Sequence, residues 1–138
     1  MSQKKFVIGC CVAGMLAAFG ARAGGDAGLV GAMWLAEDIG GAGVVDNVQS
    51  KIAIDGAGKV SGSGGCNRLV GSVQVDGDRI TFAPPATTRM MCPPAVMDQE
   101  GKFIDALQRA RTYKLDEPFL RLLGEDGAEV VRLIRAEP

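Results

Sequence analysis

The sequence predicts a mostly β domain of the α+β class: an antiparallel meander with one helix. Three observations support this. Short stretches that alternate polar and apolar residues recur along residues 33–134, Asp-Gly and Gly-rich steps separate them, and only residues 95–110 carry apolar residues at helical spacing. Alternation with a period of two is typical of strands with one face on a core and the other in water.

The predicted strands follow one another with short turns. The first contains Trp34, the only tryptophan, and ends at the glycines that follow residue 39. The Asp76-Gly77 step suits a tight hairpin turn with positive φ. The expected strands are 33–39, 50–54, 59–63, 69–75, 79–82, 112–115, 119–123 and 129–134.

The predicted helix covers residues 95–110. Val96, Phe103 and Leu107 are seven and four residues apart and so lie on one helical face. Prolines at its entrance are tolerated, because the first turn needs no N–H partner. Asp98 and Glu100 in the early turns and Arg109 in the last turn suit the helix dipole.

Residues 1–23 have the pattern of a secretory signal peptide. A start with two lysines leads into residues 6–19, a run without a charge, and Ala21 and Ala23 then give the small-x-small pattern that signal peptidase needs. The run is shorter than the roughly 20 residues of a membrane-spanning helix. We expect cleavage after Ala23 and a periplasmic or secreted protein.

Two other interpretations of the N-terminus stay open. Cys10 ends a lipobox-like sequence and would carry a lipid, although only four apolar residues separate it from Lys5. An uncleaved anchor is the other alternative. Beyond the signal, we expect a flexible lead-in over residues 24–32 and a single domain over 33–136.

Charge and composition exclude several functions. Cleavage would remove three basic residues and no acid, so the mature chain would have 12 Lys and Arg and 16 Asp and Glu, a net negative charge. This balance argues against nucleic acid, and against membrane contact other than through the signal peptide or a lipid anchor. The absence of histidine excludes Ser-His-Asp and Cys-His catalysis and His-ligated metals. We expect no enzyme, cofactor or metal; carboxylate and lysine chemistry remain formally open.

Two cysteines remain after cleavage, Cys66 and Cys92. In an oxidising compartment such a pair predicts a disulfide, with two buried free thiols as the alternative. Met90 and Met91 are expected to be core filler and rim. A soft Cu(I) site made of Met90, Met91, Met97 and the cysteines is a weaker alternative, because oxidation to a disulfide would remove both thiolate ligands.

Several motifs together resemble the META domain family, known from the bacterial heat-shock protein HslJ. A G-C-N-R sequence is followed by T-x-M-x-C, and the helix has M-x-x-x-x-x-F-x-x-x-L spacing; an opening tryptophan is a looser match. The residues that carry this resemblance are Trp34, Gly65, Cys66, Asn67, Arg68, Thr88, Met90, Cys92, Met97, Phe103 and Leu107. It extends over about residues 33–135.

The resemblance implies an antiparallel sheet that curls into a small, partly closed barrel with one helix packed across it. It implies an envelope protein linked to heat-shock or antibiotic tolerance, and it supplies no catalytic residues. From their residue types, we expect Asn67 to hold a turn. Arg68 either pairs with an acid, such as one on the helix, or is solvated.

Two functions follow from these observations. The first is a non-enzymatic exported envelope protein that contributes to stress or antibiotic tolerance by binding a protein or small ligand. The alternative is a secreted hydrolase inhibitor or small-ligand-binding β-barrel, with residues 40–47 as the contact loop.

Overall fold

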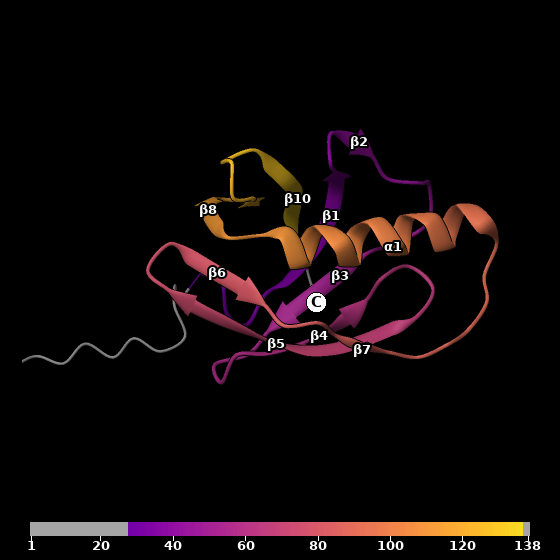
Figure 1. The fold of residues 1–138 in the computed structure, drawn as a ribbon, viewed down its shortest axis with the longest axis horizontal. Coiled ribbons are helices and arrows are strands. Elements are labelled where there is room, and N and C mark those ends of the chain that lie inside the picture. Colours follow the sequence, from indigo (N-terminus) through magenta and orange to yellow (C-terminus); the bar gives the residue numbers. More distant parts are fainter. Residues whose placement is uncertain (1–27, 137–138) are drawn as a thin grey trace, which may run out of the picture.

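Ten strands form one antiparallel sheet in the computed structural model, which describes residues 28–136 (Figure 1). Four of the eight predicted strands have the expected bounds, the others differ by one or two residues at one or both ends, and the two-residue strands at 42–43 and 86–87 were not predicted. The elements are β1 (Met33–Ile39), β2 (Ala42–Gly43), β3 (Lys51–Ile54), β4 (Lys59–Ser63), β5 (Arg68–Asp76), β6 (Arg79–Phe82), β7 (Ala86–Thr87), α1 (Pro94–Arg109), β8 (Thr112–Asp116), β9 (Phe119–Leu123) and β10 (Glu129–Ala136).

The sheet closes on itself. Its hydrogen-bonded order is β10-β9-β8-β6-β5-β4-β3-β1-β2, and β10 also pairs with β1. The β1–β10 pairing runs from Met33↔Ala136 to Ile39↔Val131, whereas β6 and β8 share the single pair Arg79↔Thr112. The curled sheet implied by the family resemblance is therefore confirmed as a ring of hydrogen-bonded strands. Its shortest pairing is that between β6 and β8.

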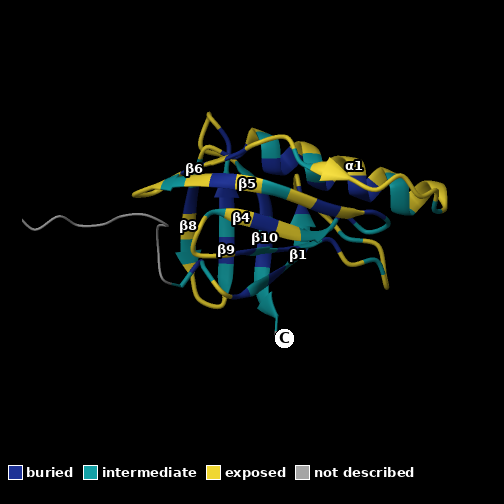
Figure 2. Ribbon diagram, turned by 90° about the horizontal axis from the view of Figure 1, so that it is seen from below, coloured by how far each residue is buried: buried dark blue, intermediate teal, exposed yellow. Residues whose placement is uncertain are grey.

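The core lies inside this ring and under the helix. Figure 2 shows buried segments alternating with exposed ones along the strands, as the period-two pattern predicts. Trp34 is fully buried, and its indole N–H donates to the carbonyl oxygen of Leu29 at 3.1 Å. Such a bond removes the cost of burying the polar end of the ring.

Helix α1 packs across the sheet (Figure 1) and begins one residue earlier than predicted. Phe103 and Leu107 are in the core as expected, but Gln99 and Glu100 are buried too. The expectation that Glu100 serves the helix dipole is wrong. No acid lies in the first turn, and the Glu100 carboxylate instead accepts hydrogen bonds from the backbone N–H groups of Cys66 and Asn67, in the loop between β4 and β5.

The described structure begins before the expected domain boundary at residue 33. Leu29 is fully buried, and the Gly31 N–H donates to the Ile54 carbonyl at 2.9 Å, so residues 28–32 are not a flexible lead-in. The proposed signal peptide, with Cys10, Ala21 and Ala23, lies outside the described residues. Within residues 28–136, no helix has the length and apolar character needed to cross a membrane.

Candidate functional site

The fold gathers most of the motif residues at one place, which we call the motif cluster. Its members come from the loop after β4, the segment that leads to α1, and the second turn of α1. They are Gly65, Cys66, Asn67, Thr88, Met90, Cys92 and Glu100. Segments far apart in the sequence are thus fastened to one another.

A disulfide joins two of these segments. The Cys66 and Cys92 sulfur atoms are 2.03 Å apart and the Cα atoms 6.0 Å apart. The predicted bridge is confirmed, and it replaces the free thiols that the copper alternative requires. Among residues 28–136, no three His, Cys, Asp or Glu side chains form a group suited to a metal ion.

Asn67 holds the cluster through its side-chain amide. Its Oδ1 accepts hydrogen bonds from the Thr88 hydroxyl at 2.9 Å and the Met90 N–H at 2.6 Å. Its Nδ2 donates to the Met90 carbonyl at 3.3 Å and to Glu100 Oε1 at 2.7 Å. The buried amide therefore uses both its donor and its acceptor capacity, and it joins three segments rather than one turn.

Glu100 is the member of the cluster that sequence reasoning missed. Its Oε2 accepts hydrogen bonds from the backbone N–H groups of Cys66 at 3.0 Å and Asn67 at 2.6 Å. A signal was present in the sequence, because Glu100 lies three residues before Phe103 and seven before Leu107, on the apolar face of the helix. A carboxylate at such a position indicates a buried partner.

Two glycines let α1 approach the loop. A Cβ on Gly64 would lie 2.5 Å from Glu100 Cγ, closer than real contacts allow. Gly65 has a φ of 132°, a region that side chains other than glycine rarely adopt. The G-G-C-N sequence therefore supplies both the space for the carboxylate and the sharp turn before Cys66.

A second set of buried bonds continues from Gln99. Its Oε1 accepts the Val45 N–H at 2.6 Å, and its Nε2 donates to the Ser50 hydroxyl at 3.0 Å. The Ser50 hydroxyl then donates to the Gly64 carbonyl at 2.6 Å. Ser50, Asn67, Gln99 and Glu100 are the buried polar side chains of residues 28–136, and all of them fasten loops to α1.

The outer side of the cluster is a hollow of about 580 Å³, which we call the basic hollow. It is lined by Lys51, Gly62, Ser63, Cys66, Arg68, Thr88 and Met90. Arg68 is exposed and forms no ion pair within residues 28–136, so the solvated alternative describes it.

From the sequence, Met90 and Met91 are expected to be core filler and rim, and the core role is wrong because both residues lie at the surface. Their side chains are 53% and 88% exposed. The reason is a contact with a distant segment: the Asn67 side chain accepts a hydrogen bond from the Met90 N–H and donates one to the Met90 carbonyl, which holds both peptide groups of Met90 toward the cluster. Apolar side chains adjacent to a core helix are usually buried, so the sequence alone gave no sign of this.

The remaining motif residues serve the core. Phe103 and Leu107 are buried, and Met97 is partly buried on the same helix. Trp34 is in β1, and the Arg135 guanidinium carbon lies 4.6 Å from the centroid of its ring. These residues do not line the basic hollow.

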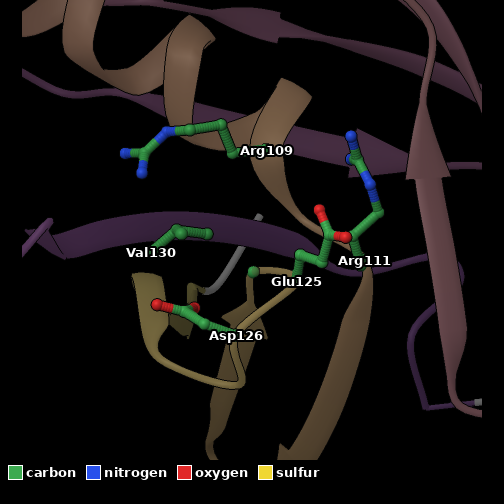
Figure 3. Close-up of a pocket in the computed structure, with 6 residues that line it drawn as sticks. Arg109, Arg111, Glu125, Asp126 and Val130 are labelled. Atoms are coloured by element: carbon green, nitrogen blue, oxygen red, sulfur yellow. The ribbon is translucent and has the colours of Figure 1, made fainter.

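A second hollow, of about 400 Å³, lies at the end of α1 and is lined by Arg109, Arg111, Gly124, Glu125, Asp126 and Val130. Figure 3 shows the two guanidinium groups directed away from each other. Arg109 pairs with Asp105 at 2.9 Å, and Arg111 donates to the carbonyl groups of Gln108 and Ala110. This hollow therefore has no convergent set of charges.

The fold and the cluster define a small, disulfide-bonded β domain whose helix is fastened by buried polar side chains. The chain belongs to the META domain family, whose model matches residues 27–137.

Two structures solved by NMR have the same fold. One is 23% identical in sequence, with a TM-score of 0.61, and the match covers 77% of this chain and 90% of the other chain. The other, from Burkholderia xenovorans, has 19% identity, a TM-score of 0.64, and covers 80% and 85%. The comparison with curated proteins gave no significant match.

Proposed function

We propose that this chain is a non-enzymatic, exported envelope protein of HslJ type that acts by binding and contributes to stress or antibiotic tolerance. The charged start, apolar run and Ala-x-Ala end of residues 1–23 support export. The Cys66–Cys92 bridge supports the same compartment, because disulfides persist in oxidising surroundings. The stress role follows from the family resemblance.

The observation that carries the binding role is how the motif residues are used. Asn67 and Glu100 point inward, and their polar atoms are bonded to the scaffold. The outward side is a hollow lined by the exposed residues Met90 and Arg68 and by the partly buried Lys51. A catalytic site would instead present titratable groups that converge on a space open to substrate.

Deletion of the gene tests this proposal. We expect reduced survival under heat or envelope-active antibiotics, restored by the wild-type gene. The double variant Lys51→Glu, Arg68→Glu should fail to restore survival, whereas Arg79→Glu, Lys114→Glu should succeed, since these exposed cations lie outside the basic hollow. Unchanged survival under every envelope stress would contradict the proposal.

Intact mass of the purified protein tests export separately. Processing after Ala23 and the loss of two hydrogens for the disulfide are expected. A chain that retains residues 1–23 with reduced cysteines would contradict export, and an added acyl mass at Cys10 would identify a lipoprotein.

The inhibitor function is the second candidate, because the loop after β1 is both exposed and fixed. Val45 is 40% exposed while its N–H is held by Gln99, and Asn47 adopts a φ of 65°, unusual for a residue other than glycine. An inhibitor should recover one dominant hydrolase from periplasmic extract and abolish its activity. Recovery of no hydrolase would contradict this alternative.

A further inference from the structure

The basic hollow lies on the outer face of three neighbouring strands. Lys51 on β3 pairs with Ser63 on β4, and Ser63 pairs in turn with Arg68 at the start of β5. The Thr88 hydroxyl accepts a hydrogen bond from the Arg68 N–H at 3.0 Å, which extends the row to the segment before α1. The strand register therefore places Lys51 and Arg68 on either side of Ser63, across three neighbouring strands.

These cations have no acid to neutralise them. Neither Lys51 nor Arg68 belongs to any ion pair within residues 28–136, and no acidic residue lines the hollow. Arg89, between Thr88 and Met90, is also exposed and outside every ion pair of that part of the chain. The chain as a whole has a net charge of −1, so this is a local positive region on a protein without basic excess.

Apolar surface is concentrated in the same region. Of the four large apolar residues that are exposed within residues 28–136, Met90 lines the hollow, Met91 follows it in the sequence, and Val70 is two residues along β5 from Arg68. Methionine and arginine are enriched in protein interfaces, and methionine adapts its shape to different partners. An exposed apolar group beside unpaired cations favours recognition of a protein.

The region is held in place before any partner binds. The Met90 N–H and carbonyl are bonded to the Asn67 side chain, and the disulfide fixes Cys92 two residues further on. A surface that is already ordered loses less conformational entropy on binding, which raises affinity.

We propose that the basic hollow docks an acidic, extended segment of a partner protein. Carboxylates of the segment would bind Lys51 and Arg68, and an apolar side chain between them would pack on Met90. This inference rests on the proposed binding function and names the chemistry of the partner. A membrane surface is disfavoured, because a chain with a net negative charge is repelled by anionic lipid.

The test measures fluorescence anisotropy of a fluorescein-labelled peptide, Glu-Leu-Asp-Leu-Glu-Leu-Asp, titrated with protein purified from cells that express the full chain. We expect saturable binding that weakens with added salt, and much weaker binding of a peptide with Gln and Asn in place of the acids. Lys51→Glu, Arg68→Glu should raise Kd by about tenfold or more, and Met90→Gln should raise it as well. The matched variant Arg79→Glu, Lys114→Glu should change Kd by less than about twofold.

Thermal unfolding of each variant serves as the folding control, and Lys51→Gln, Arg68→Gln supplies a milder pair if the charge reversal is unstable. The inference would be overturned if the acidic and neutral peptides bound equally well. It would also be overturned if the double variants Lys51→Glu, Arg68→Glu and Arg79→Glu, Lys114→Glu lost affinity for the acidic peptide to the same extent. Binding to phosphatidylglycerol vesicles in place of the peptide would overturn it too. If the peptide fails while Lys51→Glu, Arg68→Glu still abolishes complementation, only the acidic partner is wrong; an absent deletion phenotype would instead refute the proposed function.

Discussion

Several buried polar residues of this domain fasten segments that are distant in the sequence. Glu100 shows this most clearly, since its carboxylate is buried and accepts N–H groups from Cys66 and Asn67. A buried carboxylate is tolerated only where such bonds replace those to water. The residue therefore acts as an anchor for the loop after β4.

Replacing this carboxylate tests the anchor. Glu100→Gln should lower the free energy of unfolding by about 1–3 kcal/mol. Both carboxylate oxygens accept hydrogen bonds from N–H groups, so the NH₂ group of the glutamine amide would face another donor. Urea unfolding measures the change. Glu125→Gln, in an exposed turn, should change stability by less than about 0.5 kcal/mol. Equal stability of Glu100→Gln and the wild type would contradict the anchor role.

Asp55 shows the same principle in an exposed turn. Its Oδ1 accepts the N–H groups of Lys59 at 2.8 Å and Ala57 at 2.9 Å, and these bonds hold the pKa of its carboxyl below its usual value of 3.8. Since the folded-state pKa lies below the unfolded one, this stabilisation is present above pH 3.8 and is lost as the pH falls through the folded value.

The stability difference between the wild type and Asp55→Asn should therefore shrink on acidification. Urea midpoints of both proteins at about pH 6 and about pH 2.5 measure it. Asp46→Asn, in another exposed position, is the matched control. A difference that grows toward low pH would contradict the assignment.

At the scale of elements, helix α1 is fastened to the sheet at both halves by different means. Phe103 and Leu107 bury apolar surface in the second half, whereas Gln99, Glu100 and the disulfide fix the first half. The segment between β7 and α1 is not part of a strand, and it is held by the covalent bridge together with the hydrogen bonds of Asn67 to Thr88 and Met90.

Removing the disulfide should be costly. Cys66→Ser with Cys92→Ser opens a loop with a sequence separation of 26, which corresponds to about 3.5 kcal/mol in the chain-entropy account. Urea unfolding should give this loss, and a reducing agent should bring the wild type to the level of the variant while leaving the variant unchanged. Coincident midpoints for wild type and variant under oxidising conditions would contradict the stabilising role.

At the scale of the whole molecule, the strand pairings that close the ring differ in their number of hydrogen bonds. The β1–β10 pairing extends over nearly the full length of both strands, whereas β6 and β8 meet at one pair. There the Ile80 N–H donates to the Arg111 carbonyl and the Tyr113 N–H to the Asp78 carbonyl, both at 3.0 Å. Regions with few ladder bonds open at lower free energy.

Amide hydrogen exchange followed by NMR tests this difference. The amides of Ile80 and Tyr113 should exchange faster than the ladder amides of β1 and β10, because the β6–β8 contact opens without disrupting the rest of the ring. Equal protection at the two places would indicate that the ring opens only as a unit.

Sequence alone determined the local features of this protein. Strand bounds such as 59–63 and 79–82, the helix face of Phe103 and Leu107, and the pairing of Cys66 with Cys92 follow from periodicity, turn residues and cysteine number. The tertiary structure decided what depends on distant segments: the closure of β1 on β10, the hydrogen-bond partners of Glu100 and the exposure of Met90. The physical reason is that the environment of a side chain is set by what packs against it, and α1 meets the loop after β4 across more than thirty residues of sequence.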